Sequence, residues 1–203
     1  MDEKINAIKK WLDTGSINIF GEPFSGKDTQ GEQLATLLSA KLIAGGDILR
    51  SHPESKLVTD SMATGGIVPS NLYLQNVLPY LARESHTNTP LILSAVGRSH
   101  GEEPATIEAA ENSGHPLKAV LYLELSESEI WQRFKASKVK KDRAGRQDDT
   151  EQALEVRLKK FRENTIPVIK YYDDANLLIR IDGSPVTAIV TDNIINALYD
   201  FIH

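Results

Sequence analysis

A glycine-containing loop within residues 17–30 constrains the fold of this chain more than any other segment. The loop, Gly21-Glu22-Pro23-Phe24-Ser25-Gly26-Lys27, follows a β-prone apolar run and precedes leucines at helical spacing. In a strand–loop–helix unit of this kind, backbone N–H groups and the helix N-terminus surround phosphate oxygens, and the lysine reaches the terminal phosphates. The strict pattern G-x-x-x-x-G-K-S/T fails at its last position, where Asp28 stands before Thr29. The segment therefore predicts an α/β fold with an altered phosphate-binding loop.

Several short apolar runs are typical of buried parallel strands. None alternates strictly between apolar and polar residues, as expected for strands that helices cover on both faces. Helical periodicity separates the runs. Strands that alternate with helices predict a doubly wound parallel sheet of about five strands, in one domain over residues 1–203. The runs are residues 17–20, 41–43, 91–94, 119–123 and 177–181.

Local signals place the helices of the second half. Ser126 followed by Glu129 forms a capping box, which predicts a helix from about residue 127 through Phe134. Residues 150–172 are strongly helical, but Pro167 lacks a backbone N–H, so it must kink or restart the helix. A last helix is expected over about residues 186–201.

Composition narrows the class of protein. A formal net charge of −5, with 25% charged residues, disfavours a nucleic-acid partner or an anionic membrane surface. The absence of cysteine excludes disulfides, thiolate metal sites and a cysteine nucleophile. No apolar run reaches the roughly 18 residues of a membrane span, and the charged start Met1–Lys4 does not resemble a secretory signal. We therefore expect a cytoplasmic protein.

Arginines from distant parts of the sequence stand near the ends of predicted strands or beside the long helical run. A guanidinium is suited to forked recognition of phosphate oxygens. Ligands of doubly wound sheets bind beyond the carboxyl ends of the strands, where these side chains and Lys27 would meet. The pattern predicts a phosphoryl-transfer site, in which the protein positions substrates and neutralises charge. The arginines are Arg50, Arg98, Arg146 and Arg157.

These motifs resemble, in the same order, those of the adenylate kinase family of nucleoside monophosphate kinases. The resemblance covers about residues 16–200. It implies an acceptor-binding segment at about residues 45–73 and a short lid at about residues 137–149. The matching segments are 21–30 (G-x-P-G-S-G-K-G-T-Q in the family), 46–50 (G-D-x-L-R), 65–68 (G-x-x-V), 145–149 (G-R-x-D-D), Arg157, and 165–172 (T-x-P-V-x-x-x-Y).

The resemblance also implies roles for single residues. Lys27 would bind the donor β- and γ-phosphates, Arg133 would stack on the donor base, and Arg98 would hold the acceptor phosphate. Arg146 and Arg157 would stabilise the phosphoryl group in transfer, which completes the catalytic set with Lys27 and Arg98. The implied ATP-binding residues are Gly21, Pro23, Ser25, Gly26, Lys27, Asp28, Thr29 and Arg133; the implied acceptor-binding residues are Gly45, Arg50, Ile67, Val68, Arg98 and Glu102.

Two departures from the family concern the magnesium ion that accompanies ATP. The family carries an aspartate, which organises the water shell of Mg²⁺, where Ser94 stands here. Conversely, Asp28 replaces the small glycine after the loop lysine. A carboxylate beside bound phosphates requires a cation between them, so we interpret the pair of changes as a relocated magnesium anchor. The short lid has no Cys or His, and no structural zinc is expected.

Two further departures concern the loop and the acceptor base. Phe24 replaces a loop glycine, which raises the question of the backbone angles there. The family glutamine that reads adenine is Glu102 here. An ionised carboxylate only accepts hydrogen bonds, so Glu102 pairs with an amino group, suits guanine better, or points to solvent. Gly45 supplies no hydroxyl to the base. The family favours AMP as acceptor, because backbone groups near residues 66–68 can read adenine.

Other functions remain open at this point. The alternatives are a kinase for GMP, CMP or UMP, a non-catalytic nucleotide-binding protein, and a kinase for another small acceptor such as a sugar acid. The basic stretch 135–146 also suits a nucleic-acid patch, but it lacks aromatic residues, so a phosphate-closing lid is favoured. We expect ATP and a nucleoside monophosphate as partners, no nucleic acid, no membrane, and a monomer.

Overall fold

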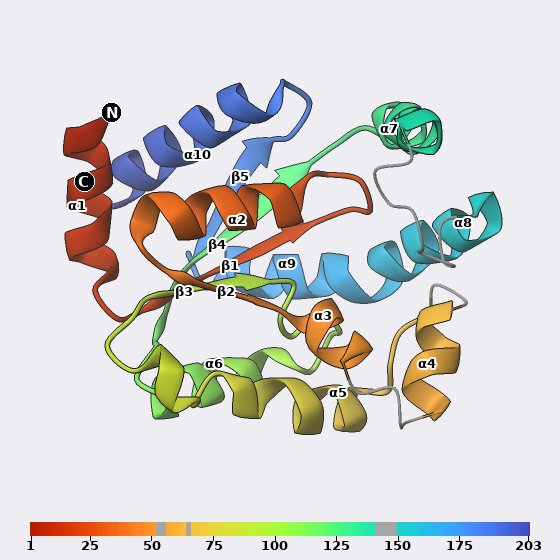
Figure 1. The fold of residues 1–203 in the computed structure, drawn as a ribbon, viewed down its shortest axis with the longest axis horizontal. Coiled ribbons are helices and arrows are strands. Elements are labelled where there is room, and N and C mark those ends of the chain that lie inside the picture. The colour runs from red at the N-terminus through yellow and green to blue at the C-terminus, as the bar shows by residue number, and fades with distance from the viewer. Residues whose placement is uncertain (52–55, 64–65, 141–149) are drawn as a thin grey trace.

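The computed structural model describes residues 1–51, 56–63, 66–140 and 150–203. Its centre is a five-stranded sheet, parallel throughout, with the strand order β2-β3-β1-β4-β5 (Figure 1). The predicted doubly wound α/β architecture is therefore confirmed. The strands are β1 (Ser16–Gly21), β2 (Lys41–Ala44), β3 (Leu91–Ser94), β4 (Leu117–Glu124) and β5 (Leu178–Asp182).

Helices cover both faces of the sheet. One face packs against α1 (Asp2–Leu12), α2 (Lys27–Leu38) and α10 (Thr187–Phe201), whose buried aliphatic side chains meet those of β1, β4 and β5. The other face packs against α6 (Glu103–Asn112) and α9 (Ile166–Asp174), where Phe20 and Tyr172 share a core. Both layers explain why β1 and β3, in the middle of the sheet, are buried throughout. The edge strand β5 differs from the expectation, since its buried Ile179 and Ile181 alternate with exposed Arg180 and Asp182.

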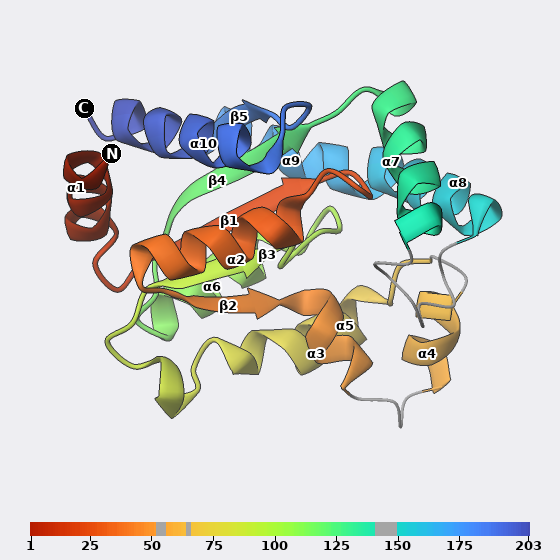
Figure 2. The ribbon, with the colours of Figure 1, turned by 45° about the horizontal axis from the view of Figure 1, so that its top comes forward.

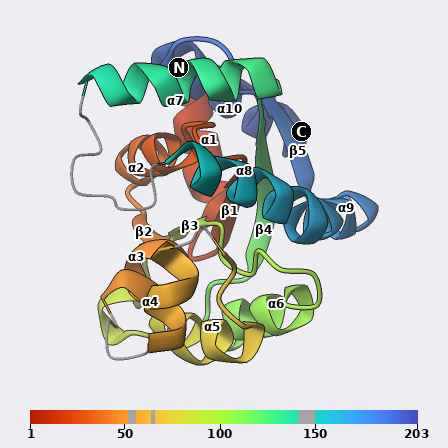
Figure 3. The same ribbon diagram turned by 90° about the vertical axis from the view of Figure 1, so that its right-hand side faces the viewer.

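A group of short helices lies beside β2 and β3 (Figure 2). It comprises α3 (Gly45–Arg50), α4 (Lys56–Ala63) and α5 (Ser70–Val77), which bury a second cluster that includes Ile48, Val58 and Tyr73. Two 3₁₀ turns, Leu78–Tyr80 and Glu84–His86, lead from α5 to β3. At the end of the molecule seen in Figure 3, α7 (Glu127–Lys140) and α8 (Glu151–Lys160) lie above α4.

The local signals read from the sequence are borne out. The Glu129 carboxylate accepts from the Ser126 amide at 2.9 Å, and the Glu129 amide donates back to the Ser126 hydroxyl, which is the predicted capping box. The long helical run restarts before Pro167, where a π-helical turn, Phe161–Thr165, joins α8 to α9. Proline cannot donate to the preceding turn, so the wider turn absorbs the missing bond.

The carboxyl ends of the strands gather the segments of interest at one edge of the sheet. There β1 leads into the phosphate-binding loop, β2 into α3, and β3 into the loop that carries Arg98. This is where ligands bind in doubly wound sheets. Within the described residues, no helix has both the length and the apolar character needed to cross a membrane.

Candidate active site

The phosphate-binding loop presents the N-terminus of α2 without a side-chain cap. Gly26 is the N-cap residue, with φ of 89°, and no side chain accepts from the first amides of the helix. Phe24 has φ of 67°, the left-handed angle that a glycine adopts readily, and its ring packs edge-on against Phe134 at 5.5 Å. Uncapped amides at a helix start are suited to an anion, so the loop offers donors to a phosphate although Phe24 replaces a glycine. Phosphate binding by the loop stays a prediction.

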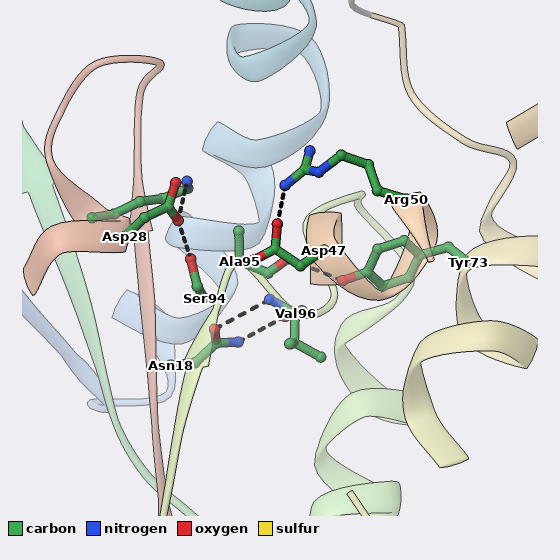
Figure 4. Close-up of polar contacts among 9 residues, drawn as sticks. Asn18, Asp28, Asp47, Arg50, Tyr73, Ser94, Ala95 and Val96 are labelled. Atoms are coloured by element: carbon green, nitrogen blue, oxygen red, sulfur yellow. Dashed lines mark hydrogen bonds and ion pairs between the residues drawn. The ribbon is translucent and has the colours of Figure 1, made fainter. Parts of the chain in front are cut away.

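A small polar cluster joins the loop to the end of β3 (Figure 4). The Ser94 hydroxyl donates to Asp28 Oδ1 at 2.7 Å, and the Lys27 ammonium donates to the same oxygen at 2.8 Å. Asp28 thus lies directly beside the residue at which the family has its aspartate. The structure therefore places the Asp28 carboxylate next to position 94, where the family has its aspartate and this chain has serine.

Positive charge converges on Lys27. Burial lowers the pKa of its ammonium group, and the nearby guanidinium groups of Arg157 and Arg98 lower it further, whereas Asp28 raises it. Cations that crowd in this way are stabilised by an anion between them. The Nε of Arg98 is buried and has no hydrogen-bond partner in the described part of the chain, and the same holds for the Ser25 hydroxyl. A guanidinium N–H and a hydroxyl of this kind are suited to phosphate oxygens.

Two open clefts meet at Lys27, Pro23 and Arg157. The first cleft, which is the larger, runs along the phosphate-binding loop past Thr29 and Arg133. The second cleft extends from the loop toward β3 and α8. The second cleft combines an apolar wall with cations. Its lining includes Phe20, Gly66, Ile67, Ala95, Arg98 and Thr165.

Arg133 of α7 connects the phosphate-binding loop to the segment after β5. Its guanidinium donates to the backbone carbonyls of Phe24 and Ser25, both at 3.3 Å, and to those of Gly183 at 2.6 Å and Ser184 at 3.1 Å. A third cleft, lined by Arg133 and by residues 183–187, opens beside this contact. Arg133 therefore holds two loops together, and its stacking on a donor base stays a prediction.

The loop after β3 is strained and held from several sides. Ala95 has φ of 51°, an unfavourable angle for a residue with a Cβ. The Ile19 carbonyl accepts from the Ala95 amide at 3.0 Å, and the Asn18 side chain bonds both the carbonyl of Val96, at 2.7 Å, and its amide, at 3.3 Å (Figure 4). The Thr165 hydroxyl of the π-helical turn donates to the Arg98 carbonyl at 2.9 Å. Together these bonds fix the backbone that carries Arg98.

Asn18 is not among the residues that the sequence patterns indicate for the site. It is fully buried in the middle of β1, among apolar neighbours. A lone amide within an apolar strand is a signal that could have marked it, because buried polar side chains need partners.

The structure places the predicted acceptor residues differently from one another. Arg98 and Ile67 line the second cleft, whereas Val68 and Gly45 are buried and do not line it. Arg50 forms an ion pair with Asp47, three residues earlier in α3. Such a half-exposed pair contributes little stability, so it can open for a ligand. Phosphate binding by Arg50 stays a prediction.

The structure contradicts one of the three alternatives for Glu102, a side chain that points to solvent. Its side chain does not point to solvent, since it is 1% exposed and accepts from the Ser99 amide at 3.1 Å. Burial raises the pKa of its carboxyl, against the opposing effects of Ser70, the Ser99 amide and Arg98. Its Oε1 is buried without a hydrogen-bond partner among the described residues. An adenine-reading or guanine-reading role for Glu102 is therefore open.

Some of the predicted site lies outside the described residues. This applies to Arg146 and to most of the lid, residues 141–149. At the start of the predicted lid, the Ser137 hydroxyl donates to the Phe134 carbonyl at 2.8 Å, and Ser137 lines the larger cleft. No group of three or more His, Asp or Glu side chains suitable for a metal ion occurs within the described residues.

A parallel sheet whose first strand enters a helix through a phosphate-binding loop, with two clefts meeting at the loop lysine, is typical of phosphate-loop proteins that bind nucleotides. The adenylate kinase family model matches residues 19–177. The adenylate kinase of Thermus thermophilus is 32% identical over 178 residues, covering 85% of this chain and 91% of its own. That of Xylella fastidiosa (strain M23) is 34% identical over 172 residues, covering 81% and 89%.

The chain therefore belongs to the adenylate kinase family and is an ATP-dependent nucleoside monophosphate kinase. The adenylate kinase of Dehalococcoides mccartyi (strain BAV1) shows the same likeness more distantly, at 29% identity over 211 residues, 90% of this chain and 97% of the relative. The resemblance read from the ordered motifs is thus confirmed at the level of the family.

The buried amide of Asn18 gives the first prediction. Asn18→Leu leaves the amide and the carbonyl of Val96 without their partner, and should lower the free energy of unfolding by roughly 2–4 kcal/mol. Since the loop also carries Arg98, KM for the acceptor should rise more than KM for ATP. Denaturant unfolding and steady-state kinetics measure both. Asn196→Leu on the exposed face of α10 is the matched control, and equal rises in both KM values would refute the positioning role.

The loop residue Glu22 gives a prediction for pH. Burial raises the pKa of its carboxyl, Oε1 accepts from the Tyr122 hydroxyl at 2.7 Å, and Oε2 is buried without a hydrogen-bond partner among described residues. The folded state therefore holds the proton more tightly than the unfolded state. The associated stability is complete below the ordinary pKa of 4.5 and is lost as the pH rises through the folded value.

Glu22→Gln removes this titration and keeps an acceptor for Tyr122. Its free energy of unfolding should therefore rise relative to that of the unchanged protein between about pH 4.5 and pH 8. Urea unfolding of both proteins across this range tests the point. If the difference in free energy of unfolding between the two proteins does not change with pH, Glu22 does not cause the pH dependence.

Proposed function

We propose that the protein catalyses the reversible transfer of the γ-phosphoryl group from Mg-ATP to AMP, giving two ADP. The observation that carries the proposal is the meeting of two clefts at Lys27 and Arg157. A donor phosphate chain along the loop would end where an acceptor phosphate held by Arg98 begins. Relatives named adenylate kinase support AMP as the acceptor.

The mechanism requires positioning rather than covalent catalysis. The acceptor phosphate is already anionic at neutral pH, so it attacks the γ-phosphorus in line and needs no general base. Lys27 and the loop amides hold the donor β- and γ-phosphates, and Arg98 holds the attacking oxygen. Arg157 stabilises charge on the equatorial oxygens as the bond to the leaving group lengthens. Arg146 is proposed to join it from the lid, residues 137–149.

The residues present fit a magnesium ion bound with ATP. Mg²⁺ takes oxygen ligands, keeps several waters, and is held by one or two carboxylates together with substrate phosphates. Asp28 supplies one carboxylate at the start of α2, and the Ser94 hydroxyl orients it. When bound, the ion would neutralise charge on the phosphates. Asp28 would hold a water of its shell, and Lys27 would then exchange Asp28 for phosphate.

Turnover of different acceptors tests the function. With Mg²⁺ and ATP fixed, AMP should give the highest kcat/KM among AMP, GMP, CMP and UMP. Coupled detection of ADP measures all four. A preference for GMP that Glu102→Gln abolishes would make Glu102 a guanine reader. Binding of ATP or AMP with no ADP formed from any acceptor would make the protein a non-catalytic nucleotide-binding protein.

The relocated magnesium anchor gives a separate prediction. Asp28→Asn keeps the acceptor for Ser94 but removes the charge, and should lower kcat about a hundredfold or more while ATP binding changes little. The double variant Asp28→Gly with Ser94→Asp returns the carboxylate to the end of β3 and should recover much of the loss. If Asp28→Asn keeps full kcat throughout a magnesium titration, Asp28 is only a helix-start acid.

Three further proposals come from the sequence alone: an acceptor-binding segment at about residues 45–73, a monomeric state and a cytoplasmic location. Analytical ultracentrifugation tests the monomeric state.

A further inference from the structure

Phe24 gives the phosphate-binding loop a backbone angle that does not suit a phenylalanine. Its φ of 67° lies in the left-handed region, which glycine adopts without strain and which a residue with a Cβ adopts at a cost in free energy. Such an angle persists in a folded protein where other contacts offset its cost. We therefore looked for a contact of the Phe24 side chain that glycine could not make.

The Phe24 ring packs against a hydrophobic cluster that α7 and α8 build together, and Figure 2 shows the loop extending toward α7. The ring is half-buried and meets the ring of Phe134 edge-on, with 5.5 Å between their centroids. Phe134 in turn meets Trp131 edge-on at 5.8 Å. Phe24 thus joins the loop to the apolar sides of both helices. The buried members of the cluster are Ile130 and Phe134 from α7, and Leu154 and Leu158 from α8.

A second attachment joins the same loop to α7 through hydrogen bonds. Arg133, the neighbour of Phe134 in the helix, donates to the carbonyls of Phe24 and Ser25, both at 3.3 Å. These distances are longer than those of a typical N–H···O bond, so the polar attachment alone is weak. An edge-on aromatic pair restricts both the distance and the angle between its rings. The ring of Phe24 is therefore suited to fix the loop against α7.

The same cluster places the arginine that we propose to stabilise the transferred phosphoryl group. Arg157 directly precedes the buried Leu158 in α8, and it lines both clefts that meet at Lys27. Lys27 follows Phe24 by three residues. The apolar contact of Phe24 therefore connects the loop that leads to Lys27 with the helix that carries Arg157.

We infer that Phe24 is a positioning residue for phosphoryl transfer, an inference that rests on the proposed function. Docking of its ring on Phe134 fixes the phosphate-binding loop relative to α7 and α8. The donor phosphates held by Lys27 then lie at the distance from Arg157 that the transfer requires. Loss of the ring slows transfer more than it weakens nucleotide binding, because the loop amides and Lys27 remain to hold the phosphates.

Glycine at position 24 separates docking from backbone geometry. If only the loop angle matters, Phe24→Gly keeps or raises kcat, since glycine suits the φ of 67° better than phenylalanine does. If docking matters, Phe24→Gly and Phe24→Ala both lower kcat roughly 10- to 100-fold, because misplacement by about 1 Å can cost a hundredfold. Phe24→Tyr keeps the ring and should keep kcat. Titration calorimetry should give an unchanged Kd for AMP and a Kd for ATP within about threefold.

A double-mutant cycle with Phe134 keeps the inference falsifiable if Phe24→Gly folds poorly. Phe134→Leu removes the partner ring and keeps an apolar side chain, and it should lower kcat without changing Kd for AMP. Combined with Phe24→Ala it should add little further loss, because both variants remove one contact. Phe201→Ala is the matched control. Phe201 also forms an edge-on pair, with Trp11 at 6.2 Å, but it ends α10, whose start lies beside the loop, so kcat should not change.

Two results would overturn the inference. One is a kcat of Phe24→Gly within about twofold of that of the unchanged protein, and the other is a fully additive loss in the double variant. Urea unfolding of each variant shows that it is folded in the assay. Absence of ADP formation by the unchanged protein with every acceptor would instead overturn the proposed function.

Discussion

The hydrogen bond from the Ser94 hydroxyl to the Asp28 carboxylate joins the two halves of the site. Asp28 lies in the first turn of α2, after the phosphate-binding loop, and Ser94 ends β3 directly before the loop that carries Arg98. A single bond of 2.7 Å thus joins the proposed donor side to the proposed acceptor side. Because β1 and β3 are adjacent and parallel, with Ile19 paired to Ser94, the two segments emerge at the same edge of the sheet. This register lets the carboxylate of residue 28 lie beside residue 94.

The acceptor side depends on a backbone that the chain holds against its own preference. Ala95 adopts a left-handed angle, and the bonds from Asn18, Ile19 and Tyr73 fix the peptide groups on either side of it. Strain of this kind persists only where the surrounding structure outweighs it. The turn places Arg98 at the cleft that Lys27 also lines. The buried amide in β1 and the buried phenol in α5 therefore support the backbone of the candidate site, although neither carries charge.

The sequence predicted what depends on local patterns. Apolar runs placed the five strands to within two residues at each end, and the Ser126–Glu129 capping box placed the start of α7, because hydrophobic period and capping act over a few residues. The sequence also contains the family motifs in the order that the family has them. The sequence did not predict contacts between distant segments, such as Tyr73 with Ala95 or Asn18 with Val96, and it left open whether Glu102 is exposed. Those depend on how helices pack against the sheet, which no local pattern encodes.

The charges of the site explain why phosphate and metal should arrive together. Before substrates bind, Asp28 offsets the cluster of Lys27, Arg98 and Arg157, and it lies favourably at the positive end of α2. In the proposed site, a triphosphate in the loop would reverse this balance, because its oxygens would face the Asp28 carboxylate at short range. Asp28 and the phosphate oxygens would then together hold a divalent cation, whose charge would offset their repulsion and leave Lys27 to the phosphates. The acid after the loop lysine would thereby make tight binding of ATP conditional on the metal, which a glycine at the same position would not do.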